Sequence, residues 1–351
     1  MRALRIIVVA FGLVTLPVGR GSEGQDLRFL QFERHLESLR QQAGIPGVSA
    51  AIVQNRQIVW EGGFGFRDVD GRILATPDTP YPVADLTSTF AATLLMQCVE
   101  QGTVHLDDSI RQWVPLAAEP GARVYDVLSH ASLSNGFQYD PSRYDSLTTV
   151  IDRCGDEPYR TRLAHDIFDR LSMVNSVPGR DLANPASPVR QLFEPEVLNR
   201  YAATLSRLAV PYRTDRRGRL TRSEYLLDHV TASAGIVSTV RDLARYDAGL
   251  DDGILLRNDS LTRMWTNVTS PTNGPLPTGL GWFVQAYKGE RLVWHFGYAP
   301  GAFSSLILKV PGRNMTFIAL ANSDDLGAAS SLANGDVTWS VFVKLFLGLF
   351  V

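Results

Sequence analysis

Apolar and polar positions follow successive patterns along the chain, and each pattern predicts a different kind of element. Between residues 28 and 42 the apolar side chains recur every three or four positions, which predicts an amphipathic helix. Residues 48–53 and 57–60 are β-prone runs on either side of a short turn, and residues 64–69 form a third such run. The early part of the chain is therefore expected to give one helix followed by three strands.

The middle of the chain has a helical pattern. A long helix is predicted from Asp85 to Gln101, because Asp85 is a typical N-cap residue, the run between them is compatible with a helix, and Gly102 ends it. Residues 122–210 then read as further helices and loops, interrupted by Pro and Asn positions.

The last third returns to a strand pattern. Short β-prone runs at residues 281–284, 292–295, 304–310 and 316–321 alternate with turns, and residues 341–347 favour a packed helix. Because strands lie early and late with helices between them, we predict an α/β (α+β) fold. It has one antiparallel sheet, built from both chain ends and flanked by helices, with an inserted and mostly helical subdomain.

This division also predicts where a site would lie. Residues 23–84 and 230–350 are expected to form the sheet subdomain, and residues 85–229 the helical subdomain. A cleft between two such subdomains is the usual place for a ligand.

Composition narrows the classes of function. The 351 residues are 45% hydrophobic and 20% charged, which is typical of a globular protein. A formal net charge of -2 gives no basic footprint for nucleic acid as a partner. The 6 His residues are scattered without paired metal-ligand spacings, so neither a metal nor another cofactor is expected.

The first residues have the pattern of a secretory signal. Arg2 and Arg5 precede an uncharged apolar run from Ile6 to Val18, and residues 1–22 are interpreted as a signal peptide. An uncleaved anchor or a buried first helix is the alternative. No later run is long and apolar enough to span a membrane, so we expect an exported protein, periplasmic or extracellular.

The chain has 2 cysteines, Cys98 and Cys154. Export would permit a disulfide between them. From the sequence we favour the alternative, in which the two thiols are buried separately and are not bonded to each other.

Several stretches resemble, in order, the serine β-lactamase and penicillin-binding-protein superfamily, in particular its class C β-lactamase, D-aminopeptidase and esterase branch. The matching landmarks span about residues 28–350 and include Gly44–Val48, Pro77–Ala84, Phe90–Asp108, Ala232–Thr239, Gly279–Phe283 and His295–Gly297. The resemblance implies this superfamily's fold, whereas function depends on the individual site residues.

The superfamily's first motif, Ser-x-x-Lys, is altered in this chain. In the motif, a Lys one helical turn after the Ser takes the proton of that weak nucleophile. Here Asp85 stands where the Ser belongs and Ser88 where the Lys belongs. The resemblance therefore implies that the usual acyl-ester cannot form. At a helix N-terminus the Asp85 carboxylate is expected to stay ionised and to occupy the oxyanion site itself.

The other two motifs are kept in part. Tyr139 is the best match to the Tyr of the Tyr-x-Asn motif, with Pro141 at the Asn position and Tyr144 as the alternative. His295, Phe296 and Gly297 match the His-x-Gly motif, in which Gly lets the backbone pass close to substrate. By resemblance, the oxyanion site would consist of the backbone N–H groups of Asp85 and Tyr298, and residues 296–298 would bind substrate.

Two functional hypotheses follow. The first is a catalytically impaired relative whose cleft still binds a peptide-like or cell-wall-derived ligand, or a protein partner. The second is an ester or amide hydrolase with relocated chemistry, in which Ser88 is the nucleophile, His295 or Tyr139 the base and Asp85 the orienting group. Attack by Asp85 or by a water that it activates is a variant of the second. A purely structural role would leave the cleft filled by side chains.

Overall fold

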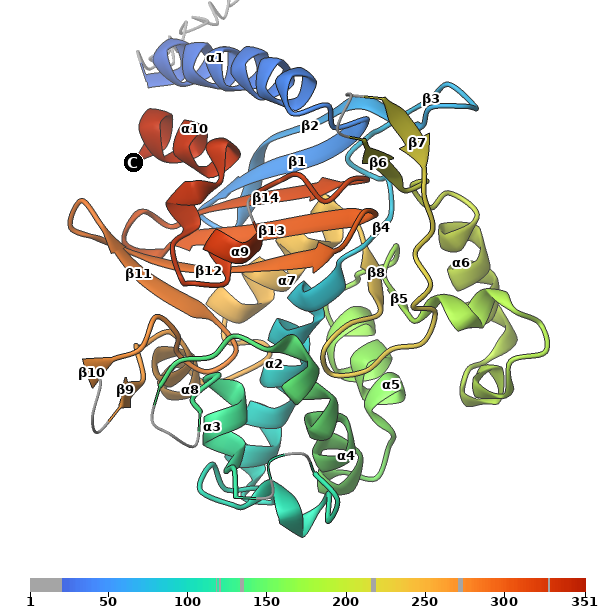
Figure 1. Cartoon of the computed structure of the whole chain (residues 1–351), viewed down its shortest axis with the longest axis vertical. Helices are drawn as coiled ribbons and strands as arrows, with labels where there is room; N and C mark the ends of the chain where they lie inside the picture. The colour runs from blue at the N-terminus through green and yellow to red at the C-terminus, as the bar shows by residue number, and fades with distance from the viewer. Residues whose placement is uncertain are drawn as a thin grey trace, which may run out of the picture.

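The computed structural model describes residues 21–117, 119, 121–132, 136–215, 219–270, 274–327 and 329–351. Its centre is a seven-stranded sheet with the strand order β11-β12-β13-β14-β1-β2-β3 (Figure 1). The strands are β1 (Gly47–Gln54), β2 (Gln57–Asp68), β3 (Ile73–Leu74), β11 (Phe283–Tyr287), β12 (Glu290–Ala299), β13 (Phe303–Val310) and β14 (Met315–Ala321).

The sheet is antiparallel and joins the two ends of the chain, as the sequence predicts. Strand β1 pairs with β14 through a continuous register from Val48 opposite Ala321 to Gln54 opposite Met315. The two β-prone runs expected at 57–60 and 64–69 form the single strand β2, because it pairs with β1 almost throughout its length across a bulge at Ile52 and Val53.

Helices cover both faces of the sheet. On one face, α1 (Gly21–Gln42) and α10 (Val341–Phe350) lie side by side (Figure 1) and bury apolar side chains such as Phe32 and Phe346 against the strands. The first helix is longer than the predicted span 28–42, since it begins at Gly21. On the other face, α7 (Val240–Asp251) and α2 (Thr87–Gln101) contribute to a second and larger core.

The rest of the described chain forms short helices and three small sheets. The other helices are η1 (Ala84–Leu86), η2 (Ile110–Gln112), α3 (Val124–Leu128), η3 (Pro141–Tyr144), α4 (Asp145–Cys154), α5 (Tyr159–Arg162), the π-helix η4 (Leu163–Asp169), η5 (Arg180–Ala183), η6 (Pro188–Leu192), α6 (Pro195–Leu205), α8 (Asn258–Met264), η7 (Pro311–Arg313), α9 (Ala329–Leu332) and η8 (Val337–Trp339). Three small sheets pair β4 (Tyr81–Pro82) and β5 (Val177–Pro178) with β8 (Ile236–Ser238), β6 (Tyr212–Thr214) with β7 (Leu220–Arg222), and β9 (Thr269–Ser270) with β10 (Gly274–Pro275).

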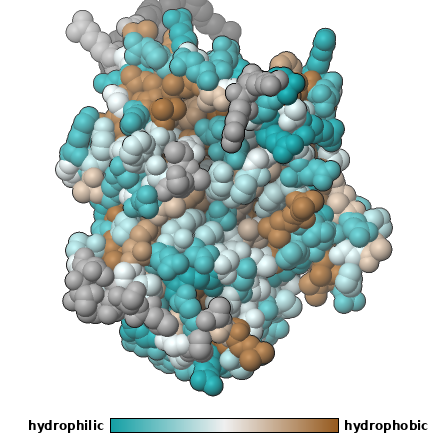
Figure 2. Space-filling view, viewed as in Figure 1, coloured by the Kyte–Doolittle hydropathy of each residue, from teal (hydrophilic) through white to brown (hydrophobic). Residues whose placement is uncertain are grey.

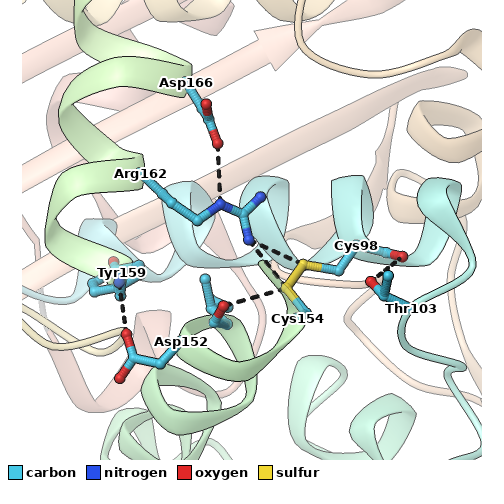
Figure 3. The surroundings of a disulfide bond; sticks show 8 residues. Cys98, Thr103, Asp152, Cys154, Tyr159, Arg162 and Asp166 are labelled. Atoms are coloured by element: carbon cyan, nitrogen blue, oxygen red, sulfur yellow. Dashed lines mark hydrogen bonds and ion pairs between the residues drawn. A yellow bond between two sulfur atoms is a disulfide. The ribbon is translucent and has the colours of Figure 1, made fainter. Parts of the chain in front are cut away.

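The two cysteines form a disulfide, so the expectation of two separate thiols was wrong. Cys98 near the end of α2 is bonded to Cys154 at the end of α4, with 6.0 Å between their Cα atoms (Figure 3). The guanidinium of Arg162 lies against both sulfurs, with Nη1 3.2 Å from one and 3.0 Å from the other. Sequence reasoning could not make this pairing, because the two positions become neighbours only when α2 packs on α4.

Residues 1–20 of the predicted signal peptide lie outside the described residues. Its last two residues, 21 and 22, are the first two of α1. Within the described residues, the helices are all too short or too polar to span a bilayer.

Candidate functional site

Asp85 lies in the single turn of 3-10 helix η1, immediately before α2. The sequence predicted Asp85 as the N-cap residue of α2, and this was wrong. The N-cap position is Leu86, and no side chain bonds to the first turn. Ala84 has a φ of 49°, a left-handed conformation that is uncommon outside Gly. The chain thus turns sharply just before Asp85, as it often does at functional sites.

The Asp85 carboxylate accepts hydrogen bonds from two backbone N–H groups. The N–H of Tyr298 donates to Asp85 Oδ2 at 3.2 Å, and the N–H of Asp85 itself also bonds to the carboxylate. Burial nevertheless raises the pKa of Asp85 from 3.8 to about 7, against the effect of these two hydrogen bonds. The sequence predicted a carboxylate that stays ionised, and this was wrong: near pH 7 it is divided between the charged and neutral forms.

Strand β12 brings the Tyr298 N–H to Asp85 because Gly297 has no side chain. A Cβ on Gly297 would lie 2.0 Å from the carbonyl oxygen of Val83 and 2.4 Å from Ser305 Oγ. Ser305 Oγ donates to the same carbonyl at 2.7 Å. The close approach that Gly297 permits is therefore to the segment just before Asp85, and it fixes that segment on the sheet.

Ser88 is sealed inside the protein one turn further along the helix. Its side chain is 1% exposed, and among the described residues its Oγ has no hydrogen-bond partner. A nucleophilic serine needs a base within hydrogen-bond reach. Neither His295 nor Tyr139 meets this condition, so the geometry gives the relocated chemistry no support.

Tyr139 reaches the same region from the loop before η3. Its ring centre lies 6.3 Å from that of His295 and 5.2 Å from that of Phe296. Its hydroxyl is buried and, within the described residues, has no partner. The pKa of the phenol is raised well above its ordinary value, first by burial and then by the charge of Asp85. Tyr139 thus packs against His295 and Phe296 and is near enough to Asp85 to feel its charge.

Tyr144, the alternative at this position, is a packed residue. It is fully buried, and its hydroxyl donates to the carbonyl of Leu128 at 2.7 Å. Phe296, predicted to bind substrate, is also buried, with 3% of its surface exposed, within a cluster of aromatic rings. The side chains of Tyr144 and Phe296 are therefore part of the packed interior.

His295 is a buried and neutral histidine. Its Nδ1 donates to the carbonyl oxygen of Phe296 at 2.7 Å, which leaves the lone pair on Nε2. Burial lowers the pKa of His295 to about 4. At pH 7 it has no positive charge to offer a ligand.

Sequence reasoning missed three residues around the site. The ring of His130 lies 4.7 Å from Tyr139, and its pKa is lowered by burial, by His295 and by Arg143. Tyr225 lies close enough to Asp85 for that charge to help raise the pKa of its phenol to about 12. Arg180 lies 5.1 Å from the Tyr225 ring centre. His130 lies in a stretch that resembles the superfamily's sequence pattern. Tyr225 and Arg180 lie in the part of the chain where that resemblance is weakest.

Solvent reaches the site only at its rim. The residues Asp85, Tyr139, Tyr225 and Tyr298 are partly exposed, whereas Ser88, His130 and His295 are buried. No group of three or more potential metal-ligating side chains occurs in the described part of the chain. The site thus consists of one carboxylate on two N–H groups, bordered by phenols and neutral imidazoles.

Comparison with known proteins identifies the family. The family model named Beta-lactamase matches residues 32–335, and the chain therefore belongs to the β-lactamase family. The protein Flp of Staphylococcus aureus (strain NCTC 8325 / PS 47) is 23% identical over 317 residues, which cover 83% of this chain and 62% of Flp. The chain thus spans less than two thirds of that relative's length.

Solved structures share the fold. The octameric penicillin-binding protein homologue from Pyrococcus abyssi has a TM-score of 0.72 at 21% identity, covering 91% of this chain and 77% of its own. The D-amino acid amidase from Ochrobactrum anthropi SV3, in complex with L-phenylalanine amide, has a TM-score of 0.71 at 20% identity, covering 92% and 98%. At such identities the likeness establishes architecture and leaves activity to the site.

Proposed function

We propose that this protein is a β-lactamase-family member that has lost covalent acyl transfer and keeps its site for binding a ligand. The observation that carries the proposal is the hydrogen bond from the Tyr298 N–H to Asp85 Oδ2. In a serine acyl-transfer enzyme, such N–H groups stabilise the oxygen of the tetrahedral intermediate. Here a carboxylate of the protein's own chain holds them.

The chemistry of the remaining groups supports the same conclusion. Covalent catalysis needs a nucleophile and a base in contact. Asp85 holds the nucleophile's place, Ser88 lacks a bonded base, and the buried Tyr139 hydroxyl is strongly disfavoured as an anion. None of these groups can readily start an acyl transfer.

The ligand class that we propose is peptide-like or derived from the cell wall. It is supported by the likeness to a penicillin-binding protein homologue and to a D-amino acid amidase. An exported location agrees with this ligand, and the Cys98–Cys154 disulfide is typical of oxidising compartments. The partly exposed rim at Asp85, Tyr139 and Tyr298 is where such a ligand would make contact.

A fluorophosphonate probe tests the loss of chemistry, because it labels serines that a base has activated. The proposal predicts no labelling of the wild-type protein, and the same result for Ser88→Ala. Labelling of the wild type that disappears in Ser88→Ala would overturn it in favour of the relocated hydrolase. A thermal melt of both proteins shows that an unlabelled sample is folded.

A further inference from the structure

The helical part of the molecule contains a cavity of about 410 Å³. It lies between residues 110–127, which include η2 and α3, and residues 140–149, which include η3 and most of α4. Its volume is in the usual range for a small-molecule site. Its lining, within the described chain, includes neither Asp85 nor Tyr298, so the cavity is separate from the candidate site described above.

The first of these two segments contributes mainly apolar side chains to the cavity. Ile110, Ala122 and Val127 are buried there, whereas Leu116 is 96% exposed. An exposed leucine by itself is ordinary on a protein surface. Here it adjoins a cavity with an apolar lining, and a ligand that covered both would remove apolar surface from water.

The second segment contributes a buried arginine whose hydrogen bonds are incomplete. The side chain of Arg143 is only 8% exposed. Its Nη2 donates to Glu119 Oε2 at 2.7 Å and to the carbonyl oxygen of Ala131 at 2.9 Å. Its Nε and Nη1 are buried and have no acceptor within the described residues. Buried N–H groups without an acceptor are uncommon and costly.

Arg143 lacks hydrogen-bond acceptors and does not lack negative charge. Glu119 already forms an ion pair with it, and Asp140 and Asp145 also line the cavity. Among the described lining residues, three carboxylates therefore accompany one guanidinium. A further anion would be repelled by this excess, and an ammonium group would leave the free N–H groups unmatched. A neutral carbonyl oxygen has two lone pairs and can accept from both without adding charge.

Glu119 determines how a ligand reaches these N–H groups. Because Nε and Nη1 of Arg143 are buried, a ligand can contact them only after a neighbouring side chain moves. The Glu119 side chain is 38% exposed, and in the described part of the chain its carboxylate bonds to Arg143 alone. It can therefore swing into solvent at the cost of one exposed ion pair, which is a small cost.

We propose that this cavity is a second binding site, for a neutral ligand with an aliphatic body and an amide or ester carbonyl group. The aliphatic body packs against Ile110, Leu116 and Val127, and the carbonyl oxygen accepts hydrogen bonds from Arg143. This site does not involve Asp85, so it stands or falls independently of the proposed function.

Three probes of similar length and different charge test the proposal by ligand-observed NMR titration at pH 7. They are neutral N-pentylacetamide, anionic heptanoate and cationic hexylammonium. N-pentylacetamide should bind the wild type at least about tenfold more tightly than either charged probe, because it alone supplies a carbonyl acceptor without a charge. Arg143→Met, which keeps the apolar stem and removes the N–H groups, should lose about that factor for N-pentylacetamide.

Two tryptophan variants locate the bound probe. Ala117 lines the cavity, and Ala117→Trp should fill it and abolish binding of N-pentylacetamide. Ala203→Trp, a matched change at an exposed position of α6, should leave the affinity unchanged. Asp85→Asn should also bind the probe as the wild type does. Thermal melts show that each variant is folded, and the tryptophan pair keeps the test decisive if Arg143→Met does not fold.

Several results would overturn the proposal. Equal or tighter binding of heptanoate or hexylammonium would contradict the neutral carbonyl ligand. An unchanged affinity of folded Arg143→Met would contradict the role of its N–H groups. Binding that survives in Ala117→Trp and is lost in Asp85→Asn would place the probe at the other site. Failure of N-pentylacetamide to bind at about 10 mM would also contradict the proposal.

Discussion

Asp85 has a carboxyl group where a serine has a hydroxyl, and its environment determines what that carboxyl group can do. Two backbone N–H groups favour its ionised form, whereas burial favours its neutral form, and the pKa of about 7 shows that burial has the larger effect. A residue that would be ionised on the surface thus becomes a titrating group near neutral pH.

Replacing Asp85 with Asn should make the stability of the protein less dependent on pH. The folded-state pKa of Asp85, about 7, is above its ordinary value of 3.8. Its favourable contribution is therefore complete below pH 3.8 and is lost as the pH rises through 7. Between pH 5 and pH 8 the wild type should lose roughly 2 to 3 kcal/mol more than Asp85→Asn. Urea unfolding of both proteins across this range measures the difference, and parallel profiles would contradict the assignment.

Two buried serines provide a matched test of whether the Ser88 hydroxyl is unbonded. Ser88 and Ser305 are each 1% exposed, but only Ser305 has a partner, the carbonyl oxygen of Val83. Ser88→Ala should leave the free energy of unfolding unchanged or raise it by about 1 kcal/mol. Ser305→Ala should lower it by about 1 kcal/mol, because it removes the hydroxyl's hydrogen bond and leaves that carbonyl with the Leu86 N–H alone. A similar loss in both variants would show that Ser88 is bonded in the folded protein.

At this scale the resemblance to the superfamily predicted which residues would lie together, but not their electrostatics. The fold brings Asp85 near Tyr298, and Tyr139 near His295, and whether they form a functional site stays a prediction. The pKa values of Asp85 and His295 could not be predicted, because they depend on burial by segments distant in the sequence. Tyr225 and Arg180 escaped notice for the same reason.

At the scale of elements, the site depends on how α2 is held at its two ends. Its first end is fixed to the sheet, where Gly297 and Ser305 of β12 and β13 meet the carbonyl of Val83. Its other end is joined to α4 by the disulfide, next to Arg162 (Figure 3). A helix held at both ends keeps Asp85 in one position.

Removal of the disulfide should lower the stability of the protein. It closes a segment of 56 residues between α2 and α4, and a loop of this size limits the freedom of the unfolded chain. The double variant Cys98→Ala with Cys154→Ala should unfold at a free energy lower by about 2 to 4 kcal/mol, as measured in urea. The wild type under a reducing agent should show the same loss. Identical midpoints for the oxidised wild type and the double variant would contradict this role.

The sequence pattern predicted the main strands and the helices α1, α2 and α10, because these segments are rich in apolar residues that pack in the core. The exceptions have tertiary causes. Strand β2 is continuous through Gly62 and Gly63 because β1 pairs alongside it, although its sequence reads as two runs. The disulfide was missed because its two half-cystines meet only through the packing of α2 on α4.

At the scale of the whole molecule, strands from both ends of the chain meet in one sheet, with α1 beside α10 on one face (Figure 1). Figure 2 shows hydrophobic residues gathered on the surface over α10, near the top of the view. The solved penicillin-binding protein homologue shares this fold with a TM-score of 0.72. The order of strands early and late along the sequence was sufficient to predict it. The architecture is therefore that of the β-lactamase family, and the loss of acyl transfer that we propose rests on a few side chains.

We propose that the fold is still competent for acyl transfer and that the residues at positions 85 and 88 are what prevents it. Hydrolysis of a small p-nitrophenyl ester by the purified protein tests it most directly, with Asp85→Ser together with Ser88→Lys as the restored variant. We expect an inactive wild type and measurable turnover in the double variant. Asp85→Ser by itself, which has a nucleophile without a base, should stay near the wild-type level. Turnover by the wild type that Ser88→Ala abolishes would contradict the account.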